Sequence, residues 1–197
     1  MTQAVFERKQ PTTAFIALGA NTTIATQSLQ EALNEALRRL DRPDCRLQRT
    51  SRLFHTPCFP VGAGSDYVNA VAVYETTLAP RDLLSRMHEI ETAMGRERVQ
   101  RWASRTMDLD LLTYGDAVLP DPATFCLWRD LAVDQRVLRA PDVLITPHPR
   151  LHERAFVLIP MADIAPEWRH PVSGLSVTQM VDALPEADRR AVRPTVS

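Results

Sequence analysis

Residues 106–114, TMDLDLLTY, alternate acidic and apolar side chains and are followed by Gly115. This apolar and aromatic content, with a glycine behind it, predicts a β-strand that ends in a turn. Because side chains at positions i and i+2 of a strand share a face, Asp108 and Asp110 point to one side. The opposite side carries Met107, Leu109 and Leu111. Any fold of this chain must therefore place two neighbouring carboxylates on one face of a strand that otherwise looks buried.

The two carboxylates need a compensating interaction. Their stems lie about 6.6 Å apart along a strand, and at an effective dielectric constant of about 20 two full charges repel by roughly 2.5 kcal/mol. One interpretation is a solvated strand face flanked by arginines. The other is a site for a hard divalent cation, because Mg²⁺ is usually held by one or two carboxylates and by substrate phosphates. The strand alone leaves both interpretations open.

Length and composition limit the alternatives. A chain of 197 residues with 45% hydrophobic content can bury one good core but is too short for two ordinary enzyme domains. A net charge of −1 lacks the basic excess of a nucleic-acid-binding protein. The sequence shows no signal-like or membrane-length apolar segment, so we expect a cytoplasmic protein. The three cysteines have no CxxC spacing and are expected to be free thiols.

Hydrophobic periodicity predicts a regular order of elements. Strands are expected over residues 13–19, 45–55, 67–76 and 106–114, and helices over 29–40 and 80–94. Ser28 and Glu31 have the spacing of a capping box before the first helix. The order strand, helix, strand, strand, helix, strand is that of a ferredoxin-like sheet. We therefore expect an α+β fold with a ferredoxin-like antiparallel sheet and helices packed on it in three α/β/α layers.

The C-terminal half is predicted less sharply. We expect a possible extra helix over residues 127–138, a short strand over 155–159 and a capped helix over 176–184. The predicted division of the chain is an N-terminal extension (1–12), one domain (13–184) with an insertion at 121–144, and a polar tail (185–197), which we expect to be mobile.

Four arginines precede the acidic strand, Arg96, Arg98, Arg101 and Arg105. The arginine fork matches phosphate oxygens, so these cations beside an acidic pair favour a metal and triphosphate site. Taken separately, the cluster is equally typical of a solvated basic loop. Trp102 within it is either a core residue or a lid over a bound ligand.

Two further segments carry candidate site residues. HTPCFP at residues 55–60 precedes a strand in which Asn69 interrupts an apolar run, and a buried amide needs partners from either the backbone or a ligand. In PHPRLHERAFVL, residues 147–158, His148 and His152 have the spacing of a helical metal pair. Pro149 argues against a helix there, so phosphate binding or a turn cap by His148 is favoured over zinc.

Several motifs together resemble the 6-hydroxymethyl-7,8-dihydropterin pyrophosphokinase family of folate biosynthesis. They are FIALGAN (15–21), TPCF (56–59), DYVNAV (66–71), GRER..RW..RTMDLDLL (95–112) and PHPRLHERAFVLIPMADIAPEW (147–168). The resemblance implies a ferredoxin-like fold whose loops close over MgATP, and a reaction that transfers diphosphate to a pterin and releases AMP.

The resemblance also implies roles for individual residues. Asp108 and Asp110 would bridge two Mg²⁺ ions, and Arg96 and Arg105 would be catalytic. ATP would be bound by Glu91, Arg96, Arg98, Trp102, Arg105, His148 and Arg154. The pterin would be bound by Thr56, Pro57, Phe59, Tyr67, Asn69 and Phe156. The expected partners are these two small molecules, with no nucleic acid or membrane, and the chain is expected to be a monomer.

The sequence departs from the family pattern in three places. GAN stands where the family more often has GSN, residues 121–144 exceed the usual connection, and LITPHP (144–149) replaces the common order LTLPHP. Two other classes compete with the pyrophosphokinase. A palm-like nucleotidyltransferase also presents paired aspartates but releases pyrophosphate, and a ferredoxin-like RNA-binding module displays aromatic side chains where this strand has carboxylates.

Overall fold

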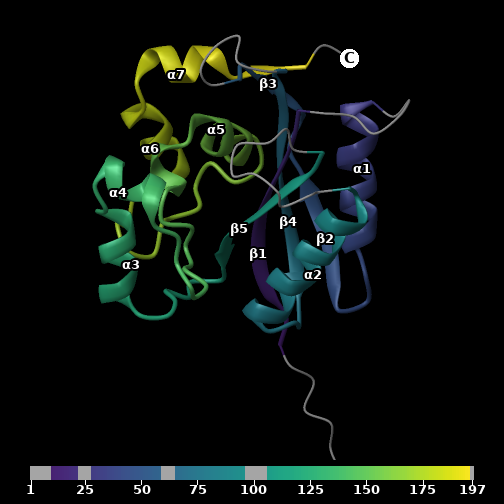
Figure 1. The fold of residues 1–197 in the computed structure, drawn as a ribbon, viewed down its shortest axis with the longest axis horizontal. Helices are drawn as coiled ribbons and strands as arrows, with labels where there is room; N and C mark the ends of the chain where they lie inside the picture. Colours follow the sequence, from purple (N-terminus) through teal and green to yellow (C-terminus); the bar gives the residue numbers. More distant parts are fainter. Residues whose placement is uncertain (1–9, 22–27, 59–64, 96–105, 196–197) are drawn as a thin grey trace, which may run out of the picture.

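The computed structural model describes residues 10–21, 28–58, 65–95 and 106–195, and its centre is a mixed-length antiparallel sheet (Figure 1). The strands follow the order β5-β1-β4-β3-β6, and β2 pairs with β4 beside β3. Their bounds are β1 Thr12–Ala20, β2 Cys45–Thr50, β3 Phe54–Thr56, β4 Tyr67–Thr76, β5 Asp108–Tyr114 and β6 Arg193–Pro194.

The register of β1 aligns the ends of three strands. Gly19 of β1 pairs with Asn69 of β4 on one side and with Asp108 of β5 on the other. Further along, the β1–β5 register shifts between Phe15 and Ile16, where Leu112 is the extra residue of a β-bulge. Directly paired residues share a face, so the acidic residues and the amide lie on the same face of the sheet.

One face of the sheet is covered by α1 (Leu29–Leu40) and α2 (Pro80–Ala93). The Ser28–Glu31 capping box is formed, with the Ser28 hydroxyl accepting from the Glu31 amide at 3.2 Å. The buried apolar stripe of α1 follows the predicted helical spacing and consists of Ala32, Leu33, Ala36, Leu37 and Leu40. Both predicted helices are therefore confirmed.

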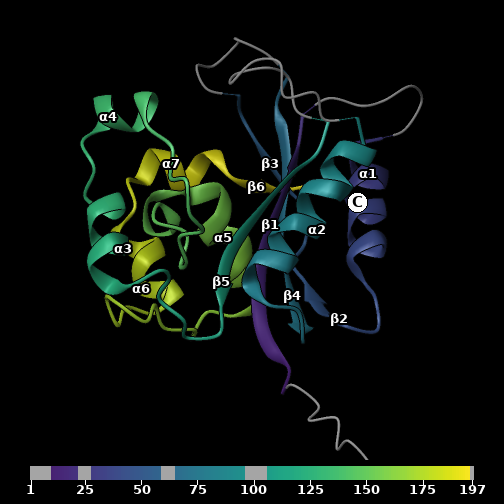
Figure 2. The same cartoon turned by 60° about the horizontal axis from the view of Figure 1, so that its bottom comes forward.

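The opposite face packs against α5 (Ala155–Ile164), and α6 (Val177–Ala183) lies against α5 in the same core cluster, as Figure 2 shows. The prediction of a strand over residues 155–159 was wrong, because these residues begin α5. A short continuous apolar run fits a buried strand and a buried helix equally well. Here Val157, Leu158 and Met161 are all fully buried, so no polar side reveals the helical period.

Three other predictions need correction. The expected strand over residues 45–55 is divided into β2 and β3, which pair with different parts of β4. The expected helix over 127–138 is two helices, α3 (Pro122–Arg129) and α4 (Val133–Leu138). The tail expected to be mobile contains α7 (Glu186–Ala191) and β6, and β6 pairs with β3.

Among the described residues, no helix has the length and apolar character needed to cross a membrane.

Helix α3 of the predicted insertion is joined to the rest of the protein by aromatic contacts. Phe125 is fully buried, and its ring centroid lies 5.6 Å from that of His170. His170 in turn contacts Trp168 at 6.0 Å, and Trp168 contacts Phe15 of β1 at 5.9 Å. A chain of rings therefore connects the insertion with the central strand of the sheet.

Replacing Phe125 with alanine should lower the free energy of unfolding by about 3–5 kcal/mol, because it leaves a cavity beside His170. Leu127→Ala is the matched control in the same helix, since Leu127 is 57% exposed. Its effect should stay within about 0.5 kcal/mol. Urea denaturation of both variants checks this, and equal losses would contradict the integration of α3 into the core.

The same ring cluster predicts a dependence of stability on pH. Burial lowers the pKa of His170 to about 4, and the charges of His152 and Arg129 act in the same direction. The unfolded chain therefore takes up the proton first, so this contribution is complete above about pH 6.5 and is lost as the pH falls towards 4. The loss should be on the order of 3 kcal/mol. Denaturation between pH 7 and 4.5 should show a shallower decline for His170→Asn, and parallel curves would contradict the assignment.

Candidate active site

The candidate site begins with a row of residues across three strands. Asp108, Gly19 and Asn69 are directly paired from β5 through β1 to β4. Since neighbouring strands are separated by about 4.8 Å, the acidic strand and the amide lie roughly 10 Å apart across the sheet. The sheet thus presents a carboxylate pair and a buried amide on one face, separated by a residue without a side chain.

The N-terminal end of α5 supplies a cation to the acidic pair. Arg154, the N-cap residue of α5, contacts Asp110 with 3.0 Å between Nη1 and Oδ2. Both side chains are only partly exposed, at 20% for Arg154 and 36% for Asp110. The guanidinium carbon of Arg154 also lies 5.6 Å from the ring centroid of Phe156, which is 39% exposed. Arg154 therefore lies between Asp110 of the acidic pair and the ring of Phe156, three residues that the resemblance assigned to the site.

The carboxylate pair suits a hard cation. Asp108 and Asp110 are half-buried on one face of β5, while Leu109 and Leu111 enter the core below. Two carboxylates beside an arginine match a Mg²⁺ ion whose remaining ligands are water and phosphate. Among the described residues, no group of three or more His, Cys, Asp and Glu side chains is arranged to hold a metal, so the zinc interpretation of His148 and His152 gains no support.

Glu91 of α2 approaches the acidic strand from the opposite face. Its side chain is 1% exposed, and its Oε1 accepts a hydrogen bond from the backbone amide of Leu109 at 2.8 Å. Leu109 lies between the two aspartates. Glu91 therefore fixes the strand segment that presents them, from the helix layer beneath.

His148 lies at the other edge of β5. Its backbone amide donates to the Leu112 carbonyl at 2.7 Å, and its Nδ1 accepts from the Arg150 amide at 3.2 Å. Burial, followed by the charge of Arg154, lowers the pKa of His148 to about 4, although Asp110 acts in the opposite direction. His148 is therefore neutral at pH 7, and its hydrogen belongs on Nε2, because Nδ1 accepts a hydrogen bond.

The amide end of the row is organised by β3 and β4. Asn69 is 6% exposed, and its Nδ2 donates to the hydroxyl of Thr56. Thr56 pairs with Tyr67 at the end of the β3–β4 ladder, and Pro57 follows it. Three further predicted pterin-side residues, Thr56, Tyr67 and Asn69, thus lie together.

Gly19 is a site residue that sequence reasoning missed. A Cβ at this position would lie 2.8 Å from Oδ1 of Asn69, closer than real contacts of this kind. The backbone of Gly19 has no positive φ, so glycine is needed here for space and not for conformation. The sequence offered only a glycine at the end of the strand expected over residues 13–19.

Asp66 is a second residue near the site that sequence reasoning missed. Its Oδ1 accepts from the Cys58 amide at 3.0 Å, and its Oδ2 lies 3.5 Å from Nε2 of His55. It therefore joins the two ends of the segment between β3 and β4. Five predicted residues lie outside the described part of the chain, namely Phe59, Arg96, Arg98, Trp102 and Arg105.

Comparison with known proteins identifies the family. The model of 7,8-dihydro-6-hydroxymethylpterin-pyrophosphokinase (HPPK) matches residues 15–166. The 2-amino-4-hydroxy-6-hydroxymethyldihydropteridine pyrophosphokinase of Pseudomonas aeruginosa is 36% identical, over 87% of this chain and 91% of the relative. The enzyme of the same name from Haemophilus influenzae is 33% identical, over 92% and 97%.

Solved structures agree at the level of the fold. A triple mutant of Plasmodium falciparum HPPK-DHPS has a TM-score of 0.64 at 16% identity, over 90% of this chain. This chain spans 45% of that longer one. The sequence match over most of the chain, together with the fold, shows that this chain belongs to the 7,8-dihydro-6-hydroxymethylpterin-pyrophosphokinase family.

Proposed function

We propose that this chain transfers diphosphate from MgATP to the hydroxymethyl group of 6-hydroxymethyl-7,8-dihydropterin and releases AMP, a step of folate biosynthesis. The observation that carries the proposal is the row of Asp108, Gly19 and Asn69, with Arg154 at its acidic end. The acidic end and the amide end of this row share one sheet face about 10 Å apart, which supports the binding of two small molecules side by side.

The acidic end is proposed to hold two Mg²⁺ ions through Asp108 and Asp110. When bound, the ions would neutralise charge on the triphosphate and on the oxygen that departs with AMP. Arg154 lies beside Asp110. If a metal ion bound the Asp110 carboxylate, the Arg154 guanidinium would be free to bind phosphate oxygens of ATP instead. His148 contributes a neutral N–H donor, and Glu91 acts through the Leu109 amide. The remaining proposed ATP contacts are Arg96, Arg98, Trp102 and Arg105, with Arg96 and Arg105 as catalytic residues.

The amide end is proposed to bind the pterin. Asn69 offers both a donor and an acceptor to the edge of the ring, and Phe156 offers an aromatic face for stacking. The proposed pterin-binding residues also include Thr56, Pro57, Phe59 and Tyr67.

In the proposed reaction, the pterin hydroxyl oxygen forms a bond to the β-phosphorus as the bond from that phosphorus to the bridging oxygen breaks. The bridging oxygen leaves with AMP, and the hydroxyl proton passes to water.

Other features of the chain remain part of the same proposal. We infer a ferredoxin-like fold with three α/β/α layers. When β2 and β3 are counted as one interrupted strand, the sheet runs β5, β1, β4, β2/β3, so the strands lie in the spatial order 4-1-3-2. We also propose one domain over residues 13–184 with an insertion at 121–144, and a monomer in the cytoplasm. ATP and the pterin are its proposed partners, without nucleic acid or membrane.

The products test the reaction directly. With γ-labelled ATP, the label should appear in the pterin product while unlabelled AMP accumulates in equal amount. Formation of ADP would indicate an ordinary kinase. Release of pyrophosphate with AMP attached to the acceptor would indicate the nucleotidyltransferase alternative.

Asp110→Asn should reduce turnover by orders of magnitude at saturating Mg²⁺, because a carboxylate ligand and the partner of Arg154 are lost together. Asp116→Asn is a suitable control, since Asp116 is exposed just beyond the same strand. Circular dichroism should show that both variants keep the fold. Near-normal AMP formation by Asp110→Asn would exclude the proposed metal site.

Gly19→Ala should weaken pterin binding by about 1–3 kcal/mol, because the added methyl group displaces the amide of Asn69. ATP affinity should stay unchanged. Asn69→Ala should cause a similar loss, and the double variant should be no worse than Asn69→Ala alone, since the clash is then absent. Calorimetry measures all three. Additive losses would show that Gly19 acts independently of Asn69.

A further inference from the structure

The short strand β3 needs support from outside the sheet. It contains only Phe54–Thr56. The Ser51 amide still donates to the Val71 carbonyl of β4 at 2.9 Å, but regular pairing with β4 is interrupted at Arg52 and Leu53 and resumes at Phe54. Such a short segment is held weakly by its own strand pairing. Yet β3 ends at Thr56, which receives the hydrogen bond of Asn69 in the proposed pterin site.

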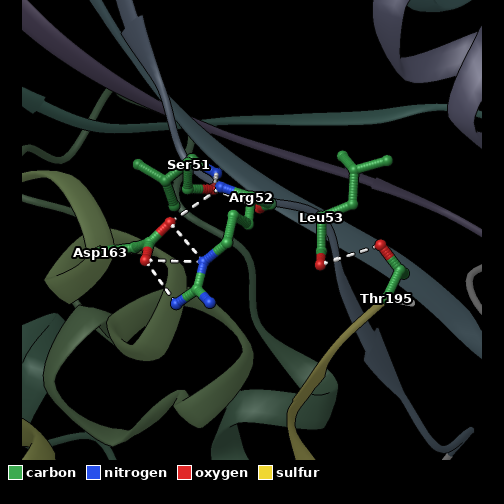
Figure 3. A network of polar contacts seen from close by, with 6 residues as sticks. Ser51, Arg52, Leu53, Asp163 and Thr195 are labelled. Atoms are coloured by element: carbon green, nitrogen blue, oxygen red, sulfur yellow. Dashed lines mark hydrogen bonds and ion pairs between the residues drawn. The ribbon is translucent and has the colours of Figure 1, made fainter. Parts of the chain in front are cut away.

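Arg52, in the break before β3, is bound by α5 (Figure 3). Asp163, near the C-terminal end of α5, accepts from the Arg52 backbone amide at 2.9 Å and from its Nη2 at 2.6 Å. Nε of Arg52 donates to the same carboxylate at 3.0 Å. The carboxylate is only 18% exposed, and Arg52 holds the pKa of Asp163 below its usual range. One side chain thus fixes both the backbone and the side chain of Arg52.

Neighbouring contacts complete the attachment. The Leu53 carbonyl accepts from the amide of Thr195, directly after β6, at 2.9 Å. It also accepts from the Thr195 hydroxyl at 3.3 Å, the contact drawn in Figure 3. On the other side, the Ser51 hydroxyl accepts from the Val71 amide of β4 at 3.0 Å. The break is therefore held at three successive residues, by β4, α5 and the C-terminal segment.

Helix α5 reaches the site at its other end. Phe156 lies seven residues before Asp163, a separation of about 10 Å along a helix axis. The ring of Phe54 is buried in the same core cluster as Val157, Leu158 and Met161 of α5. The spacing between β3 and α5 therefore sets the spacing between Thr56 and Asn69 on one side of the proposed pocket and Phe156 on the other.

We infer that Arg52 and Asp163 are positioning residues for pterin binding, which clamp β3 against α5 from a point outside the pocket. This inference rests on the proposed function, because the pocket is the proposed pterin site. Arg52 and Asp163 are bonded at the break before β3, whereas Arg154 at the other end of α5 contacts Asp110. We therefore expect loss of the clamp to affect the heterocycle end of the row more than the phosphate end.

The chain offers a matched control for this ion pair. Asp44 and Arg86 form another two-bond carboxylate–guanidinium pair, at 2.6 and 2.9 Å. That pair joins the turn before β2 to α2, on the face opposite α5. Asp44→Ala therefore removes a comparable interaction without touching β3 or α5.

Asp163→Ala should raise the KM for the pterin roughly tenfold and leave kcat and the KM for ATP within about twofold, because only pocket geometry is relaxed. Asp163→Asn, which keeps an acceptor for the Arg52 amide, should have a smaller effect. Asp44→Ala should leave all three constants unchanged, even where it lowers the melting temperature equally.

Amide hydrogen exchange provides a readout that is independent of activity. Exchange at Phe54, His55 and Thr56 should accelerate in Asp163→Ala but not in Asp44→Ala. An unchanged pterin KM in Asp163→Ala, or an equal rise in Asp44→Ala, would overturn the inference. If the unsubstituted chain formed no AMP, the proposed function would fail, and the exchange rates would still decide whether Asp163 holds β3.

Discussion

The pairing of β1 with β4 on one side and with β5 on the other is the constraint on which the candidate site depends. Because side chains alternate along a strand, a slip of one residue on either side of β1 would turn the acidic pair or Asn69 towards the α1–α2 face. Burial on both faces resists such a slip, since Ile16 and Leu18 belong to one core and Phe15 to the other. The two cores thus fix the register that assembles the site.

The parts of the fold that the sequence predicted are those with a visible period or cap. Helix α1 has a polar face and a capping box, and β5 alternates. The start of helix α5 was taken for a strand because residues 155–159 are all apolar, and its identity is decided by packing against the sheet. The pairing of β6 with β3 joins segments more than a hundred residues apart, which local patterns do not encode.

The candidate site also contains residues that a local sequence pattern indicated and residues that only the folded chain revealed. Alternation alone placed Asp108 and Asp110 on one face, and an amide within an apolar run singled out Asn69. The need for glycine at position 19 depends on where the Asn69 side chain lies in three dimensions, and the clamp of Arg52 by Asp163 depends on the break between β2 and β3. Residue type and pattern indicated the candidate residues, whereas the spacing between them required the folded chain.

The β-bulge at Leu112 has a consequence for how this sequence can change over time. A bulge absorbs one extra residue by local bending. The β1–β5 register on one side of Leu112 can therefore change without changing the register on the other side. Asp108 and Asp110 precede the bulge in β5, and the connection to α3 follows it. Insertions or deletions near residues 113–121 can therefore be accommodated without rotating the carboxylates, so the length of this connection and the orientation of the acidic pair are free to change independently.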